Sequence, residues 1–264
     1  MGWILVTNDD GWDSPALVPL ARALGALEEV RTVVPDRERS WISKAITRFE
    51  EVSVERADRD GCAMWRTTGC PADCAQIGIH ALFDTLPDVV VSGINVGYNH
   101  GLAFLMSSGT VGGATEGWIA GLPAVACSTG VSEGHAEWAR AAQEAGARHG
   151  WERAAAVCAD VVATVLARGI PGDADLLSVN LPWGSGPETP REITELGRVG
   201  YDQVFQETAP GRYAHRFEGF SRRGDASLAR SDLIATRRGV VAVTPVRLPS
   251  SANVSTADRE AFER

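Results

Sequence analysis

Short apolar runs alternate with segments of helical spacing along the first two thirds of this chain. Uninterrupted apolar runs are typical of strands buried on both faces of a parallel sheet. We expect five such strands, at 3–7, 30–34, 88–92, 123–128 and 176–180. Strands and helices alternate from residue 3 to about residue 182, which predicts an α/β fold with a Rossmann-like, doubly wound, mostly parallel sheet.

The segments between the strands carry helix signals. Ser14-Pro15 has the chemistry of an N-cap followed by proline at the first helical position, and leucines at helical spacing follow it. A second helix is expected to start near Asp73, which can cap it. A third follows the small residues at 107–114, and the helical pattern over 136–168 is interrupted near His149-Gly150.

The pattern changes after residue 185. Polar alternation over 189–224 predicts an extended β-hairpin arm, which cannot bury its own faces and is therefore expected to pack on another subunit. A strand at 240–246 and a helix within 250–264 follow. We expect one domain overall. Its catalytic part covers 1–185, and a C-terminal arm, strand and helix cover 186–264.

Composition narrows the classes of partner. The 264 residues are 44% hydrophobic, and 25 Lys plus Arg face 34 Asp plus Glu, giving a formal charge of −9. This balance speaks against binding a nucleic-acid polymer. Without a long apolar run or a charged leader, the chain is expected to be cytoplasmic and free of membrane. Five cysteines without paired short spacing predict unpaired thiols, and Lys44 is the sole lysine.

Polar side chains follow three of the predicted elements. Asp9 and Asp10 come directly after the first strand, and neighbouring carboxylates favour a hard cation such as Mg²⁺, Mn²⁺ or Ca²⁺, although Asn, Asp and Gly also cluster in simple turns. Ser40 and Ser43 lie in the loop after the second strand. Asn95 lies in a glycine-rich loop that also holds His100. Carboxyl ends of parallel strands share one edge, so we expect these loops to meet.

A candidate phosphate-binding segment begins the third helix. Ser108, Gly109 and Thr110 are small residues at a helix N-terminus, where free N–H groups and a partial positive charge favour a phosphate. Close helix packing would use the same small residues. Neither G-x-x-x-x-G-K-[ST] nor, after the first strand, G-x-G-x-x-G is present, which argues against Walker-type and dinucleotide sites.

Six blocks together resemble the SurE family, survival proteins that act as metal-dependent 5′/3′-nucleotidases. The blocks span nearly the whole chain in order: Asn8-Asp9-Asp10-Gly11, Pro35-Asp36-Arg37 with Ser40, Ser92-Gly93-Ile94-Asn95, Ser108-Gly109-Thr110-Val111, Asn180-Leu181-Pro182 and Val243-Thr244-Pro245. The resemblance implies hydrolysis of nucleoside monophosphates to nucleoside and phosphate, and a dimer or tetramer with swapped C-terminal hairpins.

The resemblance also implies roles for individual residues. One divalent ion, Mg²⁺ or Mn²⁺, would be held by Asp9, Asp10, Ser40 and Asn95, with either aspartate handling the proton of the attacking water. Ser108, Gly109 and Thr110 would lie against the phosphate. Further candidates for substrate contact are Asn8, Asn95 and Ser43.

Two segments depart from the family pattern. Trp41 and Ile42 follow Ser40 where small residues are usual, and the run at 102–107 lacks the acidic pair and aromatic residue that commonly precede the Ser-Gly-Thr block. These changes leave two alternatives to a nucleotidase: a related phosphatase for a non-nucleotide or modified phosphate ester, and a non-catalytic nucleotide- or phosphate-binding protein. Adjacent acids, in place of D-x-D, argue against a covalent aspartyl phosphatase.

Overall fold

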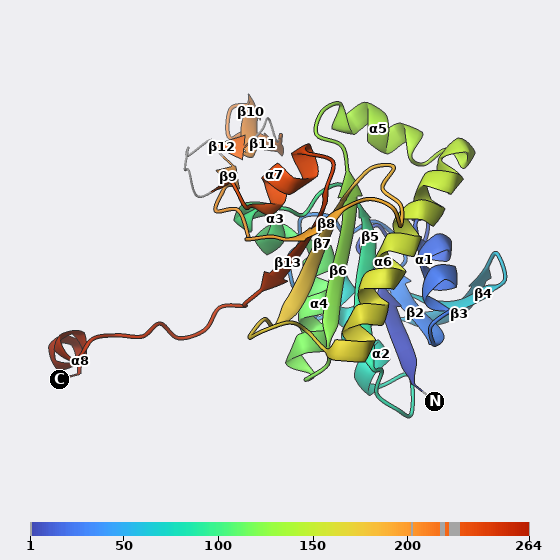
Figure 1. Ribbon diagram of the computed structural model, residues 1–264, viewed down its shortest axis with the longest axis horizontal. Coiled ribbons are helices and arrows are strands. Elements are labelled where there is room, and N and C mark those ends of the chain that lie inside the picture. Colours follow the sequence, from blue (N-terminus) through green and yellow to red (C-terminus); the bar gives the residue numbers. More distant parts are fainter. Residues whose placement is uncertain (1, 202, 217–219, 222–227, 264) are drawn as a thin grey trace.

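The chain forms a nine-stranded mixed sheet covered by helices on both faces (Figure 1). The computed structural model describes residues 2–201, 203–216, 220–221 and 228–263. The strand order is β3-β4-β2-β1-β5-β6-β7-β13-β8, and β4 to β7 in that order are mutually parallel. This confirms the predicted α/β fold with a mostly parallel sheet.

The strands of this sheet have the following bounds: β1 Trp3–Thr7, β2 Glu29–Pro35, β3 Val54–Arg59, β4 Cys62–Thr67, β5 Val89–Val96, β6 Ala124–Gly130, β7 Leu176–Pro182, β8 Arg191–Ile193 and β13 Val241–Val246. All five residues of β1 are buried, as are all seven of β6. Burial on both faces accounts for their continuous apolar character.

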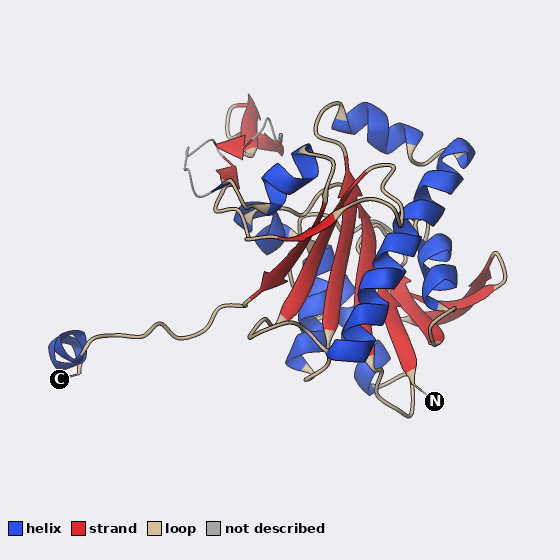
Figure 2. Cartoon of the chain, in the orientation of Figure 1, coloured by secondary structure: helices blue, strands red, loops and turns tan. Residues whose placement is uncertain are grey.

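The helices are α1 Leu17–Leu24, α2 Pro71–His80, α3 Leu102–Ser107, α4 Gly109–Ile119, α5 His135–Ala141, α6 Arg148–Arg168, α7 Asp232–Arg237 and α8 Thr256–Phe262, with a 3-10 turn at Ala145–Ala147. Helices α1 and α6 pack together on one face of the sheet, while α2 and α4 pack together on the other (Figure 2). Within the described residues, no helix has both the length and the apolar character to cross a membrane.

Strand β1 lies where the winding of the sheet reverses. It pairs with β2 on one side and with β5 on the other, both in parallel. At such a reversal, the connections that leave the two neighbouring strands run to opposite sides of the sheet and leave a crevice beyond the carboxyl ends of the strands. Ligands of open α/β sheets bind in this crevice. The loop after β1 that carries Asp9 and Asp10 therefore lies at this reversal.

The C-terminal segment extends the sheet and continues beyond it. Strand β13 is antiparallel to β7 and parallel to β8. Two small ribbons, β10 Phe205–Ala209 with β11 Arg212–His215 and β9 Gly200–Tyr201 with β12 Phe220–Ser221, lie beyond the sheet. The β10–β11 pair is a hairpin within the predicted segment, whereas β8 joins the main sheet, and the use of this segment as an arm on another subunit stays a prediction. Residues 217–219 and 222–227 lie outside the described residues. The chain then runs away from the body to α8, the predicted terminal helix (Figure 1).

A buried aspartate ties this segment to the glycine-rich loop. The carboxylate of Asp232 accepts hydrogen bonds from the backbone N–H groups of Gly101 at 2.7 Å and Gly197 at 3.1 Å. It also accepts one from Leu233 at 2.9 Å. Helix α7 is thereby fixed against the loop that follows β5, although the sequence pattern did not predict this helix.

Two helix starts differ from the sequence prediction. Helix α1 begins at Leu17 and not after Ser14, whose carbonyl accepts a hydrogen bond from Arg59 of β3 at 2.9 Å. Helix α2 begins at Pro71, and Asp73 is its third residue, accepting a hydrogen bond from the Cys70 N–H at 2.8 Å. The predicted structural role of Asp73 is confirmed, but this residue lies inside the first turn of α2 and is not the residue before it.

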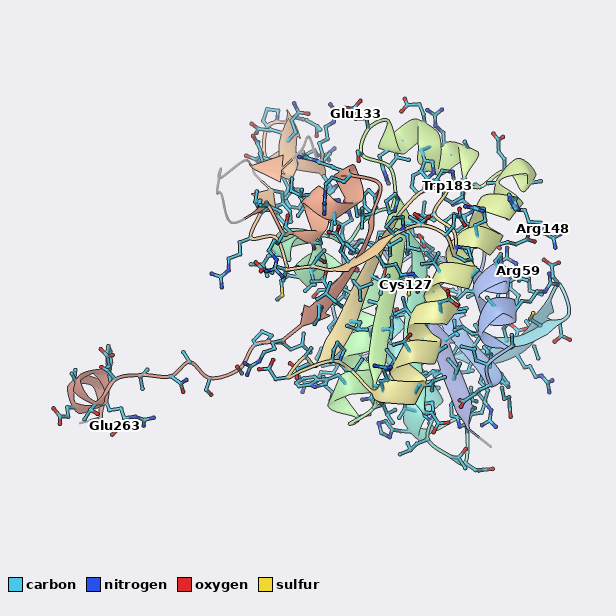
Figure 3. All side chains as sticks on the ribbon, in the orientation of Figure 1. Arg59, Cys127, Glu133, Arg148, Trp183 and Glu263 are labelled. Carbon is cyan, nitrogen blue, oxygen red and sulfur yellow. The ribbon has the colours of Figure 1, made fainter. Side chains whose placement is uncertain are left out.

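The interruption predicted at His149-Gly150 is wrong, because both residues lie inside α6 and the break falls at 142–147. A Cβ on Gly150 would lie 2.5 Å from the Trp183 ring, so this glycine serves helix packing. Figure 3 shows Trp183 beside α6 and Cys127 on the central strand β6. All five cysteines are free thiols, as predicted.

Strand β5 continues past Ser92, where the sequence predicted its end. Its register against β6 shifts between Ser92 and Asn95, and Gly93 there has φ +134°. A Cβ on Gly93 would lie 2.3 Å from the carbonyl oxygen of Cys127, so only glycine lets β5 stay this close to β6. The shift carries Asn95 to the carboxyl edge of the sheet.

Candidate functional site

A cavity of about 550 Å³ opens at the carboxyl edge of the sheet, beside the end of β1. Its walls come from the loops after β1, β2, β5 and β6, from α3 and from the C-terminal segment. The lining residues are Asp9, Glu38, Ser40, Trp41, Asn95, Val96, Gly97, Tyr98, Asn99, His100, Phe104, Ser107, Ser108, Val131, Ser132, His135, His215 and Arg237. The loops that the sequence predicted to meet do meet here.

The acidic turn after β1 is shaped by Asn8. The side-chain amide of Asn8 donates to the carbonyl of Gly11 at 3.0 Å, and its oxygen accepts from the Gly11 N–H at 3.2 Å. This clamp holds the turn that carries Asp9 and Asp10. Asp9 is buried and lines the cavity, while one oxygen of Asp10 accepts from the Val96 N–H at 3.0 Å.

A buried polar network holds Asp9 from behind. The Thr110 hydroxyl donates to Asp9 at 2.6 Å and lies 3.3 Å from the side-chain amide of Asn99, which donates to it. That amide also donates to the hydroxyl of Ser128 at 2.9 Å, and the Asn99 N–H donates to the side chain of Asn180 at 2.9 Å. The network fixes the Asp9 carboxylate through the ends of β6 and β7.

Burial controls the protonation of both acids. It raises the pKa of Asp9 from 3.8 to about 6, against the opposing effect of hydrogen bonds from Thr110. Burial, followed by repulsion from Asp9, raises the pKa of Asp10 well above its ordinary value. The charge of Glu38 raises both further. Two crowded carboxylates of this kind are stabilised as anions by a nearby cation.

Ser40 and Asn95 bring neutral oxygens to the same cavity. The Ser40 hydroxyl donates to Glu38 at 2.6 Å, and the Asn95 amide N–H donates to the carbonyl of Gly97 at 2.7 Å. The hydrogen bond to Gly97 uses the amide nitrogen of Asn95. The side-chain oxygen of Asn95 is the acceptor atom that can coordinate a cation.

The donor set fits a hard divalent ion. Carboxylate, hydroxyl and amide oxygens are the ligands that Mg²⁺ and Mn²⁺ prefer. No group of three His, Cys, Asp or Glu side chains suited to a metal occurs in the described part of the chain, so the set is mixed.

The start of α4 lies directly against the acidic turn. Ser108 caps the helix by accepting from the Val111 N–H at 3.1 Å. A Cβ on Gly109 would lie 2.8 Å from the Asp9 Cβ and 3.1 Å from the Arg39 carbonyl oxygen. The glycine therefore lets the positive end of the helix reach the carboxylate, where an anion bound beside a metal would also be stabilised.

Asp10, Gly109 and Thr110 do not line the cavity: Asp10 accepts from the Val96 N–H and Thr110 donates to Asp9, so the predicted contact of Gly109 and Thr110 with a phosphate stays a prediction. Two further candidates from the sequence have side chains directed elsewhere. Both polar atoms of the Asn8 side chain bind Gly11, and Asn8 does not line the cavity. The Ser43 hydroxyl donates to the carbonyl of Met106 at 2.8 Å, and this residue also lies outside the cavity lining. Both side chains shape the loops that bear the cavity residues.

Sequence reasoning missed several lining residues. Glu38 lay in a charged loop without a motif, although its place two residues before Ser40 was a usable signal. Arg237 and His215 come from the C-terminal segment, which the pattern assigned to an arm and a connection. Among the described lining residues, Arg237 is the only arginine or lysine, and it is a candidate to face an anionic ligand.

The loop after β2 is anchored to α4 by the sole lysine. Lys44 forms an ion pair with Glu116, which is only 2% exposed, and Gln76 of α2 donates to the other oxygen of Glu116 at 2.6 Å. Ser43 adds a backbone hydrogen bond to Ser107 at 3.0 Å. The pair holds the segment carrying Ser40 against the helix that carries Ser108.

Lys44→Met is expected to destabilise the protein by about 2 kcal/mol, because it leaves the Glu116 carboxylate buried without its cation. Urea unfolding followed by circular dichroism measures the effect. As the matched control, Lys44→Met with Glu116→Gln is expected to recover most of the loss, because no charge then remains buried. Equal stability of the single variant and the wild-type protein would contradict the pairing.

Comparisons with known proteins point to one family. The family model described as "Survival protein SurE" matches residues 4–203. A 5'-nucleotidase SurE from Methanocella arvoryzae is 33% identical over 264 residues, covering 99% of this chain and 97% of its own. One from Geobacter metallireducens is 35% identical over 252 residues, covering 93% and 91%. The crystal structure of a SurE protein from Aquifex aeolicus matches with a TM-score of 0.74 and 32% identity, covering 99% and 98%.

Proposed function

The chain belongs to the SurE family, and from this membership we propose that it is a divalent-metal-dependent nucleotidase that hydrolyses nucleoside 5′- and 3′-monophosphates to nucleoside and phosphate. Membership supports nucleotidase or phosphatase activity in general. The choice of nucleoside monophosphates rests on the names of the relatives and on the size of the cavity, since about 550 Å³ lies in the range of small-molecule sites.

The observation that carries the proposal is the contact between Asp9 and the start of α4. A buried carboxylate, hydrogen-bonded to Thr110 at 2.6 Å, lies against a helix N-terminus in a cavity that also holds Ser40 and Asn95. Oxygen ligands for a cation and N–H donors for an anion are thus adjacent. A phosphate ester bridging the two regions would satisfy both.

In the proposed mechanism, Asp9, Asp10, Ser40 and Asn95 hold one divalent ion, Mg²⁺ or Mn²⁺. Bound there, the ion supplies Lewis-acid polarisation of the phosphoryl group. The N–H groups at the start of α4 stabilise charge on the phosphoryl oxygens. A water molecule attacks phosphorus, the bond from phosphorus to the ester oxygen breaks, and the nucleoside oxygen takes up a proton. Thr110 keeps Asp9 oriented, so that Asp9 or Asp10 can accept the proton of the water.

Phosphate release from a panel of esters tests the proposal. The panel contains 5′- and 3′-nucleoside monophosphates, ribose 5-phosphate and hexyl phosphate, each with Mg²⁺, Mn²⁺ or EDTA. Metal-dependent release that is fastest from nucleoside monophosphates is expected. Faster release from hexyl phosphate would favour a phosphatase for a non-nucleotide ester. Nucleotide binding without release under metal saturation would identify a binding protein.

Protons and metal are expected to compete for the same carboxylates. The folded-state pKa of Asp9 is raised to about 6, above its ordinary 3.8. The favourable contribution of this group to stability is therefore fully present below about pH 4 and is lost as pH rises through about 6. Metal binds the ionised form, so the increase in Tm caused by Mn²⁺ should be larger at about pH 7.5 than at about pH 5.

Differential scanning fluorimetry with and without Mn²⁺ measures this difference. The Asp10→Asn variant is the control, because loss of a ligand charge should reduce the metal-induced shift at both pH values. A shift of equal size at both pH values in the wild-type protein would contradict the assignment of Asp9 and Asp10 as ligands.

The assembly proposed with this function is a homodimer or homotetramer built through the C-terminal segment. The side chain of Phe262 in α8 is 87% exposed, and α8 lies away from the body of the subunit. Light scattering after size-exclusion chromatography, compared between the full chain and a chain ending before α8, tests whether this segment supports the oligomer.

A further inference from the structure

Aromatic rings gather at one side of the cavity, around Trp41. The ring centroid of Trp41 lies 5.5 Å from that of Phe104, 5.6 Å from that of Tyr201 and 4.5 Å from that of His215. Trp41, Phe104 and His215 line the cavity, and Tyr201 lies behind Trp41. We call these four residues the aromatic wall.

The aromatic wall is assembled from three separate parts of the chain. Trp41 follows β2, Phe104 belongs to α3, and Tyr201 and His215 belong to β9 and β11. Helix α3 contacts β9, and Figure 1 shows the small ribbons beyond the end of the sheet. Residues so far apart converge on one cavity only through the tertiary fold.

Trp41 holds an unfavourable backbone conformation to reach this place. Its φ is +60°, a left-handed value that costs energy for a bulky side chain. The residue is 39% exposed, so the cost is not offset by burial in a core. Strained backbone of this kind clusters at active sites and ligand-binding loops.

The aromatic wall and the proposed phosphate-binding residues lie on the same segments of the chain. Trp41 directly follows Ser40, and Phe104 lies one turn before Ser107 and Ser108 at the start of α4. Ser40, Ser108 and Asp9 line the same cavity. An ester whose phosphate lies at Asp9 therefore has its alcohol part within reach of the rings.

We propose that the aromatic wall determines substrate specificity by binding the flat ring of the alcohol part, the base of a nucleoside monophosphate. The inference rests on the proposed function. Aromatic side chains stack with bases of any sequence because every base has a π-face. The imidazole of His215, which lines the cavity, can hydrogen-bond to ring nitrogens and exocyclic groups, whereas an alkyl chain would leave it without a partner in the ligand. Tyr201 contacts Trp41 and supports its ring from outside the cavity lining.

The experiment compares AMP with ribose 5-phosphate, which shares the phosphate and sugar but lacks the base. The ratio of kcat/KM for the two esters is measured for wild type, Trp41→Leu, Trp41→Phe and His215→Ala. Loss of base stacking is worth about 5- to 150-fold, so Trp41→Leu should lower the ratio by that factor. Trp41→Phe retains a ring and should recover most of it. His215→Ala should lower the ratio less than Trp41→Leu.

Trp118→Leu is the matched control. Trp118 is 36% exposed, similar to Trp41, and does not line the cavity, so its replacement should leave the ratio unchanged. An unchanged ratio in Trp41→Leu, with wild-type hydrolysis of AMP intact, would overturn the inference and leave the proposed function standing. A higher kcat/KM for hexyl phosphate than for AMP would also overturn it.

A binding measurement separates failure of the inference from failure of the proposed function. Calorimetric titration with AMP and with ribose 5-phosphate, in EDTA and in Mn²⁺, requires no turnover. Tighter binding of AMP that depends on Trp41, without phosphate release, would support the aromatic wall and refute the nucleotidase. Equal affinity for the two ligands in the wild-type protein would refute the aromatic wall.

Discussion

Replacement of Asp9 or Asp10 by asparagine is expected to lower kcat for nucleotide hydrolysis on the order of 10³-fold. Each change keeps the size of the side chain and removes a charge that the proposed metal site needs. Asp9 also receives the hydroxyl hydrogen bond of Thr110 at 2.6 Å, which an amide oxygen can still accept. The variants should therefore fold normally, and phosphate release with Mn²⁺ under saturating AMP measures the loss.

The same substitutions are expected to stabilise the metal-free protein near neutral pH. Burial and mutual repulsion raise the pKa of Asp10 well above its ordinary value, so its ionised form is costly in the folded state. Asp10→Asn removes that cost, and its Tm in EDTA should exceed that of the wild type. Wild-type rates in both variants would refute the mechanism, whereas lower stability in EDTA would refute only the electrostatic account.

Gly109→Ala is expected to lower kcat/KM by about 100-fold, because it separates the start of α4 from the acidic turn. The added Cβ would lie 2.8 Å from the Asp9 Cβ and 3.1 Å from the carbonyl oxygen of Arg39. Neither atom is the far end of a flexible side chain, so α4 or the turn must move. The proposed metal ligands and the N–H groups at the start of α4 then no longer lie at the distance that a single phosphate ester needs to contact both.

Gly146→Ala is the control for this change. A Cβ on Gly146 meets no atom within 4 Å, so the same substitution there should alter neither activity nor the Mn²⁺-induced shift in Tm. For Gly109→Ala, weaker Mn²⁺ binding should accompany the lower kcat/KM. Activity of Gly109→Ala equal to that of Gly146→Ala would show that the contact between α4 and Asp9 is not needed for the reaction.

The predicted sheet succeeded because its signals are local. Apolar runs such as 3–7 and 123–128 are long enough to require burial on both faces, which specifies parallel strands between helices. The helix boundaries were less accurate, because α1 and the break before α6 depend on Arg59 and Trp183, which contact these segments from elsewhere in the chain.

The sequence by itself determined the five central parallel strands and the edge at which the loops bearing Asp9, Ser40, Asn95 and Ser108 meet, since the carboxyl ends of parallel strands share one side. It did not determine where each side chain points. The local turn to Gly11 directs Asn8 away from the cavity, and a hydrogen bond to the distant Met106 carbonyl does the same for Ser43. Tertiary packing also brings His215 and Arg237 to it. Such contacts join segments with no shared periodicity, so only the folded chain could decide them.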